Sequence, residues 1–344
     1  MRKTIYLIAI VVVATACGAG EPDRPESLRL IAHDSFAGSV NEETFAAFTD
    51  ATGIEVEMIA AGDSGSMVNQ AALSAGNPLA DVLFGVDDTF LSRALDEGIF
   101  VEHISPLLMD VTADLAPPSE MVTPIDFGDV CINYDKAWFA ETGTEVPVDL
   151  DQLRDPAYAG VLTVEHPATS SPGLAFMLAT IEEYGEEGWT NFWTELKQGG
   201  VKVVPDWDTA YYGDFLPYGG ESAMVVSYAS SPPAEVIFAT GPTDEAPTGV
   251  IEAGCYRQVE YAGVLAGTEY PEAAGELIDF MLSVEFQETV PLTWFVFPVN
   301  EEAELPPEFV EHTIIPSDPA RFDAGIIAEN RDRWIDEWVA VMES

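Results

Sequence analysis

Two short segments rich in hydroxyl groups could hold an anion. Thr169-Ser170-Ser171-Pro172-Gly173 opens a predicted helix, and Tyr228-Ala229-Ser230-Ser231-Pro232-Pro233 follows a predicted strand. Hydroxyls and free backbone N–H groups at a helix N-terminus suit a phosphate or a carboxylate. The alternative for each turn is an ordinary N-cap, which stabilises a helix by about 1 kcal/mol. Spacing alone favours the N-cap for a single turn, but two such turns in one half of the chain indicate a binding site.

A third segment, Gly62-Asp63-Ser64-Gly65, contains the core of the nucleophile motif of chymotrypsin-type serine proteases. Those proteases are built from β-strands, whereas here the tetrapeptide links a predicted strand to a predicted helix, which disfavours Ser64 as a nucleophile. A glycine-rich turn that presents backbone N–H groups at a helix start fits this setting better. Asp63 is then available to a ligand.

Aromatic residues could provide the walls of a site. Trp207 and Trp294 lie in polar or turn-like settings rather than on the apolar stripe of a helix. For a single tryptophan, burial in the core is the commoner outcome, but indole faces in a cleft would bind a flat heterocycle or a cation. The Tyr211-Tyr212 pair could instead ligate ferric iron, although its place on a short predicted helix favours core packing. The chain has no CxxC pair and its four histidines are scattered, so no metal site is predicted.

These residues must be positioned by an alternation of short strands and helices. Such an alternation predicts a mostly parallel sheet covered on both faces, arranged here as two α/β lobes. In such sheets ligands lie beyond the carboxyl ends of the strands, where loops 61–65, 169–173 and 228–232 fall. Ser171 is the predicted N-cap of the helix that begins at Pro172. The predicted strands are 28–31, 54–59, 81–86, 161–164, 201–204 and 222–228, and the predicted helices are 41–52, 66–75, 87–95, 172–184, 271–282 and 319–342.

The N-terminus predicts export. Arg2 and Lys3 precede an apolar run of about a dozen residues that ends in small residues before Cys17, and the chain then turns polar. This run is shorter than the roughly 20 residues that span a bilayer, which indicates a signal peptide, residues 1–16. Cys17 is the predicted lipidation site and plain secretion is the alternative. No later segment is predicted to span a membrane.

The other two cysteines, Cys131 and Cys255, are then expected in an oxidising compartment. Two cysteines of an exported protein usually form a disulfide, with two unrelated buried thiols as the alternative. We therefore expect their Cα atoms to lie within about 7 Å of each other.

The charge excludes some partners. The chain has 60 acidic and 13 basic side chains, and its formal charge of −47 becomes −49 without residues 1–16. Nucleic acids and anionic membrane surfaces would repel such a protein. A surface suited to high salt explains the acidity without any ligand, and attraction of a cationic ligand would be screened beyond about 8–10 Å. Charge alone therefore does not identify the ligand.

The order and spacing of several segments resemble the thiamine-binding proteins of bacterial ABC importers, over nearly the whole chain from Leu28 to Val341. The segments that carry the resemblance are His33-Asp34-Ser35-Phe36, Ala80-Asp81-Val82, Thr169-Ser170-Ser171-Pro172-Gly173-Leu174, Val226-Ser227-Tyr228-Ala229-Ser230-Ser231-Pro232, Phe286-Gln287 with Val290-Pro291, Trp294 with Phe297-Pro298-Val299, and Arg333-Trp334 with Glu337-Trp338.

The resemblance implies a type II periplasmic binding protein of two α/β lobes with a ligand cleft between them. It implies a monomer that binds thiamine or a thiamine phosphate, catalyses no reaction, needs no cofactor and delivers its ligand to a membrane permease. The implied ligand-binding residues are His33, Asp63, Ser64, Ser170, Ser171, Trp207, Tyr228, Ala229, Ser230, Ser231 and Trp294.

Two positions depart from the family pattern, since His33 replaces a tyrosine and Ala234 stands where an aromatic residue is expected. A ferric-ion or polyamine binder on the same fold therefore stays open, as does an extracytoplasmic enzyme. The expected division is residues 17–24 as a lipid-anchored linker, 25–128 with 262–344 as the first lobe, and 129–261 as the second lobe. Because the first lobe is discontinuous, two or more strands must cross between the lobes.

Overall fold

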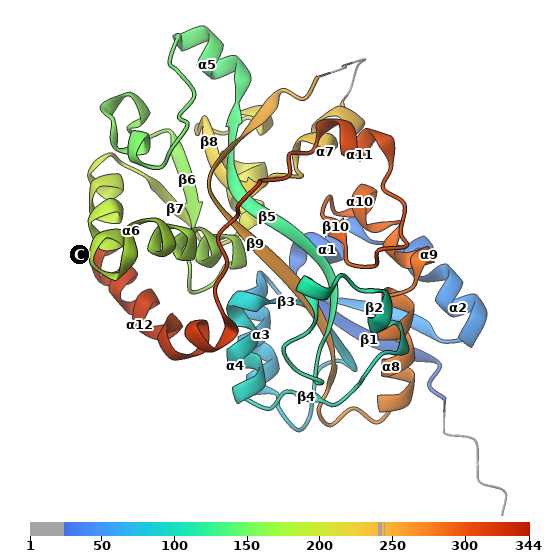
Figure 1. Cartoon of the computed structure of the whole chain (residues 1–344). Coiled ribbons are helices and arrows are strands. Elements are labelled where there is room, and N and C mark those ends of the chain that lie inside the picture. The colour runs from blue at the N-terminus through green and yellow to red at the C-terminus, as the bar shows by residue number, and fades with distance from the viewer. Residues whose placement is uncertain (1–23, 240–242, 244) are drawn as a thin grey trace, which may run out of the picture.

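The computed structural model describes residues 24–239, 243 and 245–344 (Figure 1). The predicted signal peptide and the predicted lipidation site at Cys17 lie outside the described residues. The described strands join one sheet in the order β2-β1-β3-β9-β5-β8-β6-β7, with β10 beside β5 and β4 beside β9. Their bounds are β1 Ser27–Ala32, β2 Glu55–Ala60, β3 Val82–Asp87, β4 Phe100–Val101, β5 Thr123–Asp135, β6 Leu162–Glu165, β7 Lys202–Val204, β8 Met224–Tyr228, β9 Thr248–Leu265 and β10 Phe297–Pro298.

The helices cover this sheet at both of its ends (Figure 1). Their bounds are α1 Asp34–Ser39, α2 Ala46–Thr52, α3 Ser64–Leu73, α4 Asp88–Asp96, α5 Lys136–Thr142, α6 Ser171–Gln198, α7 Pro232–Ile237, α8 Pro271–Met281, α9 Val284–Gln287, α10 Val290–Thr293, α11 Pro307–His312 and α12 Ala324–Met342. Among the described helices, none combines the length and apolar character needed to cross a bilayer.

Two groups of parallel strands form two lobes. In the first, β1 pairs in parallel with both β2 and β3. In the second, β6 pairs in parallel with β7 and β8. In both lobes a loop leads from the carboxyl end of a strand into a helix, as in the steps from β2 to α3 and from β6 to α6. The carboxyl ends of the strands are the places where α/β sheets bind ligands.

The two longest strands connect the lobes. β5 and β9 pair antiparallel over most of their length, from Thr123 opposite Ala262 to Asp135 opposite Thr248, with two register shifts. At one end β9 also pairs with β3, and in the second lobe β5 also pairs with β8. The predicted disulfide is present on these strands, between Cys131 and Cys255, whose Cα atoms are 4.3 Å apart.

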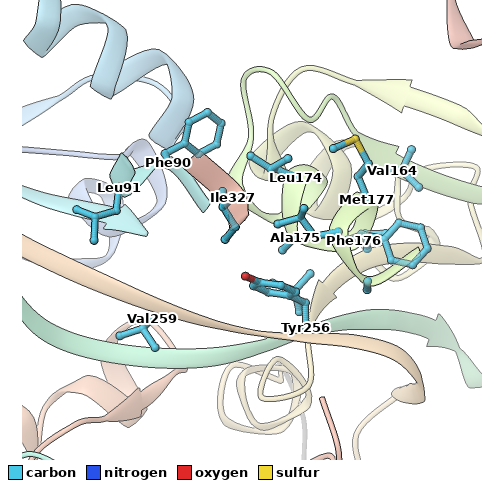
Figure 2. Packing of buried hydrophobic residues seen from close by; sticks show 14 of the residues in the cluster. Phe90, Leu91, Val164, Leu174, Ala175, Phe176, Met177, Tyr256, Val259 and Ile327 are labelled. Carbon is cyan, nitrogen blue, oxygen red and sulfur yellow. The ribbon is translucent and has the colours of Figure 1, made fainter. Parts of the chain in front are cut away.

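One apolar cluster continues from lobe to lobe on one side of the sheet. α12, the C-terminal helix, packs against α4 of the first lobe and α6 of the second. Figure 2 shows this cluster, in which side chains of the three helices meet residues of β6 and β9; the labelled ones are Phe90, Leu91, Val164, Leu174, Ala175, Phe176, Met177, Tyr256, Val259 and Ile327. This buried cluster joins helices of the two lobes.

The structure differs from the predicted helices at their ends. The segment predicted as one helix over 41–52 begins as a 3₁₀ turn, Glu42–Phe45, capped by Asn41, before α2. α3 begins at Ser64, two residues earlier than predicted, because Asp63 rather than a later residue caps it. The prediction of Ser171 as an N-cap was wrong, since Ser170 takes that position and Ser171 lies in the first turn of α6. α6 also runs past Tyr184 to Gln198, with a break at Gly185, where φ is 67°.

Candidate ligand-binding site

A cavity of about 530 Å³ lies between the lobes. This volume is in the range of small-molecule sites. First-lobe residues at its lining come from the start of α1, the turn before α3 and the segment after α10, and second-lobe residues come from α6, the 206–218 region, β8 and α7. The lining residues are His33, Asp34, Ser35, Gly38, Ser39, Asp63, Ser64, Ser171, Pro172, Trp207, Asp208, Tyr211, Tyr212, Tyr218, Tyr228, Ser231, Ala234, Phe238, Glu260, Thr293, Trp294, Phe295 and Val296.

Most of the residues predicted from the sequence meet in this cavity. His33, Asp63, Ser64, Ser171, Trp207, Tyr228, Ser231 and Trp294 are all among its lining residues. Ser170, Ala229 and Ser230 are not. Ser170 and Ser230 are fully buried, and Ala229 packs against the Cys131–Cys255 disulfide.

Asp63 joins the two lobes. Its Oδ1 accepts a hydrogen bond from the backbone N–H of Ser64 (2.7 Å), which caps α3, and its Oδ2 accepts one from the N–H of Trp207 in the second lobe (3.3 Å). Burial raises the pKa of Asp63, while the Ser170 hydroxyl and the His33 ring act in the opposite direction. The lobes also touch where the Gly65 N–H donates to the Thr169 carbonyl (3.2 Å).

The Ser64 hydroxyl has a structural role. It is buried and donates to the carbonyl oxygen of Gly85 (2.7 Å). Gly85 has a φ of 94°, and a Cβ at this position would collide with the His33 ring. This glycine therefore allows the imidazole to pack against β3, and Ser64 ties α3 to the same strand.

Aromatic rings from both lobes face the cavity. Trp207 stacks on Tyr211 with ring centroids 4.9 Å apart and planes 15° apart, and its Nε1–H donates to the Ser227 hydroxyl (2.9 Å). In the first lobe, Trp294 packs edge-on against Phe36 (4.9 Å) and its Nε1–H donates to Asp126 Oδ2 (2.9 Å). Each indole is therefore held in one orientation by a ring contact and a hydrogen bond.

The two tyrosines considered as iron ligands have different surroundings. Tyr211 is buried beneath Trp207, and its hydroxyl donates to Glu235 (2.7 Å). Tyr212 is half exposed, and its ring is nearly perpendicular to that of Tyr211. Within the described residues, no group of three or more His, Cys, Asp and Glu side chains is arranged to hold a metal ion.

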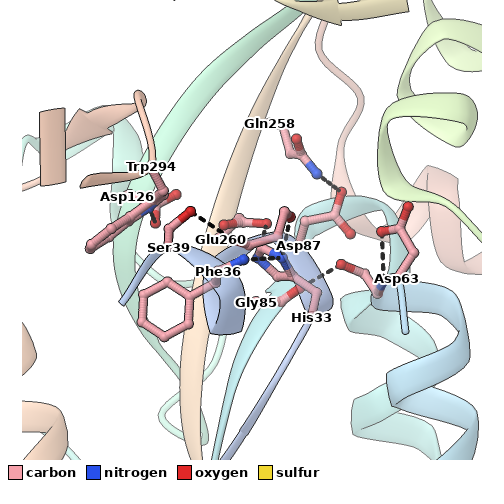
Figure 3. Close-up of polar contacts among 12 residues, drawn as sticks. His33, Phe36, Ser39, Asp63, Gly85, Asp87, Asp126, Gln258, Glu260 and Trp294 are labelled. Carbon is pink, nitrogen blue, oxygen red and sulfur yellow. Dashed lines mark hydrogen bonds and ion pairs between the residues drawn. The ribbon is translucent and has the colours of Figure 1, made fainter. Parts of the chain in front are cut away.

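Three carboxyl groups form a row across neighbouring strands, and one of them, Glu260, lines the cavity (Figure 3). Glu260 of β9 lies opposite Asp87 of β3 on one side and opposite Asp126 of β5 on the other. We call these three residues the acid row. Burial raises the pKa of Asp126 well above its usual range, and the adjacent Glu260 raises it further. Burial raises the pKa of Asp87 to about 6, although Thr89, Ser171 and Gln258 act in the opposite direction.

His33 faces the acid row with one nitrogen. Its Nδ1 accepts a hydrogen bond from the Phe36 N–H (3.2 Å), which leaves Nε2 to carry a proton 3.4 Å from Glu260 Oε1. Burial alone would lower the pKa of His33, but the carboxylates of Glu260, Asp63 and Asp208 together outweigh burial and raise it. In the second lobe, the Tyr228 hydroxyl donates to Gln258 Oε1, and Gln258 Nε2 donates to Asp87 Oδ2. The acid row is thus connected to both lobes.

Sequence reasoning missed the acid row. Asp126 lies inside an apolar stretch, Pro124-Ile125-Asp126-Phe127, and Glu260 lies in Val259-Glu260-Tyr261. An acidic residue within an apolar strand is a signal for a site, because buried carboxyl groups need partners. No strand was predicted over 123–135 or 248–265, so these two acidic residues could not be recognised as buried in a sheet.

The fold and this cleft define a two-lobed solute-binding protein, and comparisons agree. The family model of bacterial extracellular solute-binding proteins matches residues 77–317. This chain belongs to that family.

Particular relatives are similar over almost the whole chain. The thiamine-binding periplasmic protein of Escherichia coli (strain K12) is 30% identical, with 90% of this chain and 92% of the relative covered. A solved structure of a periplasmic thiamin binding protein superposes with a TM-score of 0.82 at 26% identity, covering 92% and 96% of the two chains. Iron-bound HitA from Pseudomonas aeruginosa shares the fold, with a TM-score of 0.71 at 20% identity and coverage of 92% and 99%. The predicted type II periplasmic binding fold is confirmed.

Proposed function

We propose that this chain captures thiamine outside the cell and delivers it to an ABC permease without reacting with it. The observation that carries the proposal is the composition of the cavity. Its lining contains aromatic rings from both lobes and the carboxyl groups of Asp34, Asp63, Asp208 and Glu260, and no lysine or arginine among the described residues. The similarity to thiamine-binding periplasmic proteins supports the same ligand.

Thiamine has the features that this lining recognises. Its thiazolium ring is a permanent cation, which the faces of aromatic rings and nearby carboxylates stabilise. Its aminopyrimidine ring is flat and carries N–H donors that suit carboxylate acceptors. In this arrangement Trp207, Tyr228 and Trp294 form the wall, and Asp63 lies near the cationic or amino part of the ligand.

The two residues that depart from the family pattern, His33 and Ala234, are compatible with the proposed thiamine site. Ala234 lines the cavity where an aromatic residue was expected, but Phe238, the residue that follows α7, also lines it. His33 fills the tyrosine position and adds an ionisable group beside Glu260.

We also propose how the protein is exported and divided. Residues 1–16 act as a signal peptide and Cys17 as the lipid attachment site, so that a monomer is held at the outer face of the membrane. Residues 25–128 and 262–344 form the first lobe and residues 129–261 the second. The course of β5 and β9 through both strand groups supports this division, and bending of these strands would open the cleft.

Replacing Trp207 by alanine tests the proposed stacking. A cation on an aromatic face gains about 0.5–2 kcal/mol, so Trp207→Ala is expected to weaken thiamine binding from several-fold to about thirtyfold. Equilibrium dialysis measures this without depending on tryptophan fluorescence. Trp138→Ala, on α5 and outside the cavity lining, is the control and should bind as the unchanged protein does. Equal affinities of the two variants for thiamine would contradict the proposed site.

A further inference from the structure

We infer that Asp87 and Asp88 make a pH-sensitive junction between α4 of the first lobe and the crossing strand β9. The junction is firm while the two carboxyl groups share a proton, and it is weakened when both are charged. Neither residue lines the cavity between the lobes. The inference therefore does not depend on the identity of the ligand, and it rests on the hydrogen bonds and charges around this pair.

Both aspartates bind β9 at the middle of the sheet. Asp88 Oδ2 accepts a hydrogen bond from the Tyr256 hydroxyl (2.7 Å), and its Oδ1 accepts one from the Val259 N–H (3.1 Å). Asp87 Oδ2 accepts a hydrogen bond from Gln258 Nε2 (2.8 Å), as Figure 3 shows. Because Asp87 ends β3 and Asp88 begins α4, these bonds hold the start of α4 against β9.

Tyr256 lies where several segments of the chain meet. It is opposite Val130 of β5, and it forms an isolated bridge with Ala320 in the segment that leads into α12. Its side chain is fully buried in the apolar cluster that joins helices of the two lobes. The bond from Tyr256 to Asp88 thus links α4 to a strand that connects the lobes. A shift of β9 relative to α4 would break this bond.

The first negative charge of the pair belongs on Asp87. Its Oδ1 caps α4 by accepting a hydrogen bond from the Phe90 N–H (3.3 Å), and the Thr89 hydroxyl donates to its Oδ2 (2.8 Å). Together with Gln258, three residues donate to this one carboxyl group. The N-terminus of a helix also favours a negative charge.

A second charge, on Asp88, is disfavoured. Burial raises the pKa of Asp88 to about 7, and the charge of Asp87 acts in the same direction, although the bonds from Tyr256 and Val259 oppose the shift. The two carboxyl groups therefore titrate as an interacting pair.

The surroundings supply little positive charge to offset the second carboxylate. Arg321 and Arg331, from the segment before α12 and from α12 itself, form ion pairs with Asp114 and Asp332. The helix α3, which packs against α4, contains no ionisable side chain. The other ionisable groups that interact with the pair are Tyr228, Tyr256, Glu260 and Tyr261.

The direction of the pH effect follows from these shifts. An exposed aspartate loses its proton near pH 4, whereas Asp88 in the closed junction keeps its proton up to about pH 7. The closed junction therefore binds a proton that the opened, hydrated junction releases. Opening becomes easier as the pH rises from about 4 to about 7, and it changes little above about pH 8.

Hydrogen exchange of the ligand-free mature protein between pH 5 and pH 8 tests the inference. The peptides to follow cover residues 88–96 and 256–260, and their rates are corrected for the intrinsic effect of pH on amide exchange. Local opening exposes these amides without unfolding the whole protein. We expect their protection to fall by about tenfold or more over this range.

Two variants of α4 separate the junction from other effects of pH. Asp88→Asn retains an oxygen acceptor for the Val259 N–H but cannot become charged, so its protection should change by less than about threefold. Asp96→Asn removes an exposed acid at the other end of α4 and should behave as the unchanged protein does. Thermal unfolding checks that both variants fold.

Tyr256→Phe provides an independent test, because it retains the ring and removes the hydroxyl that favours the charged form of Asp88. The loss of protection should then occur at a pH about one unit higher. A constant protection in the unchanged protein, or an equal loss in Asp88→Asn, would overturn the inference. If Asp88→Asn does not fold, a transition at the same pH in Tyr256→Phe and in the unchanged protein would overturn it.

Discussion

Arg257→Ala is expected to lower the free energy of unfolding by about 3–5 kcal/mol, because it leaves a buried carboxylate without its partner. Arg257 of β9 lies opposite Asp129 of β5, and two hydrogen bonds join them, from Nε to Oδ1 (2.7 Å) and from Nη2 to Oδ2 (2.8 Å). The Asp129 side chain is 0% exposed and that of Arg257 is 16% exposed. The guanidinium also lies 5.0 Å from the Phe127 ring centroid. Urea-induced unfolding measures the loss.

An exposed ion pair provides the matched control. Arg24 and Glu276 are both nearly half exposed, so Arg24→Ala should cost about 1 kcal/mol or less. The double variant Asp129→Asn with Arg257→Ala should recover part of the lost stability, since it removes the unpaired charge. Equal losses for Arg257→Ala and Arg24→Ala would show that the buried pair does not stabilise the crossing strands.

Removing the Cys131–Cys255 disulfide is expected to lower the free energy of unfolding by about 2–5 kcal/mol. The bond joins residues 124 positions apart, on the two strands that connect the lobes. A cross-link over so long a loop strongly restricts the unfolded chain. The measurement compares urea-induced unfolding of the oxidised protein with that of a double alanine variant, both lacking Cys17.

Thiol labelling of the unfolded, unreduced protein is the control for the disulfide. No thiol should react before reduction, and two should react after it. Reaction of both thiols without reduction, or an unchanged unfolding midpoint in the double alanine variant, would contradict the expected role of the bond.

The alternation of strands and helices was predictable because it depends on local patterns. Asn41 and Gly53 mark helix ends through a capping side chain and through backbone freedom, and the apolar periodicity between them is clear. Strands that cross between the lobes were expected, but the positions of β5 and β9 were not predicted, because buried acids and glycines interrupt their apolar pattern. Their stability comes from pairing between residues more than a hundred positions apart, which no local window contains.

The candidate site was predictable at its turns and not along its strands. Asp63, Ser171, Trp207 and Trp294 stand out because loops and helix starts present polar and aromatic groups to a cleft. Ser230 was predicted beside Ser231, yet only Ser231 lines the cavity, because neighbouring residues at a strand end face different directions. Glu260 could be recognised as a residue of the site only from the strand register, which places it between Asp87 and Asp126.

The most direct test of the central claim is a calorimetric titration of the mature protein, refolded to remove any bound ligand, with thiamine. We predict saturable binding of one thiamine per chain at micromolar concentration, and no comparable binding of Fe³⁺ or spermidine. Absence of thiamine binding at millimolar concentration, together with saturable binding of iron or the polyamine, would contradict the account and leave only the solute-binding fold.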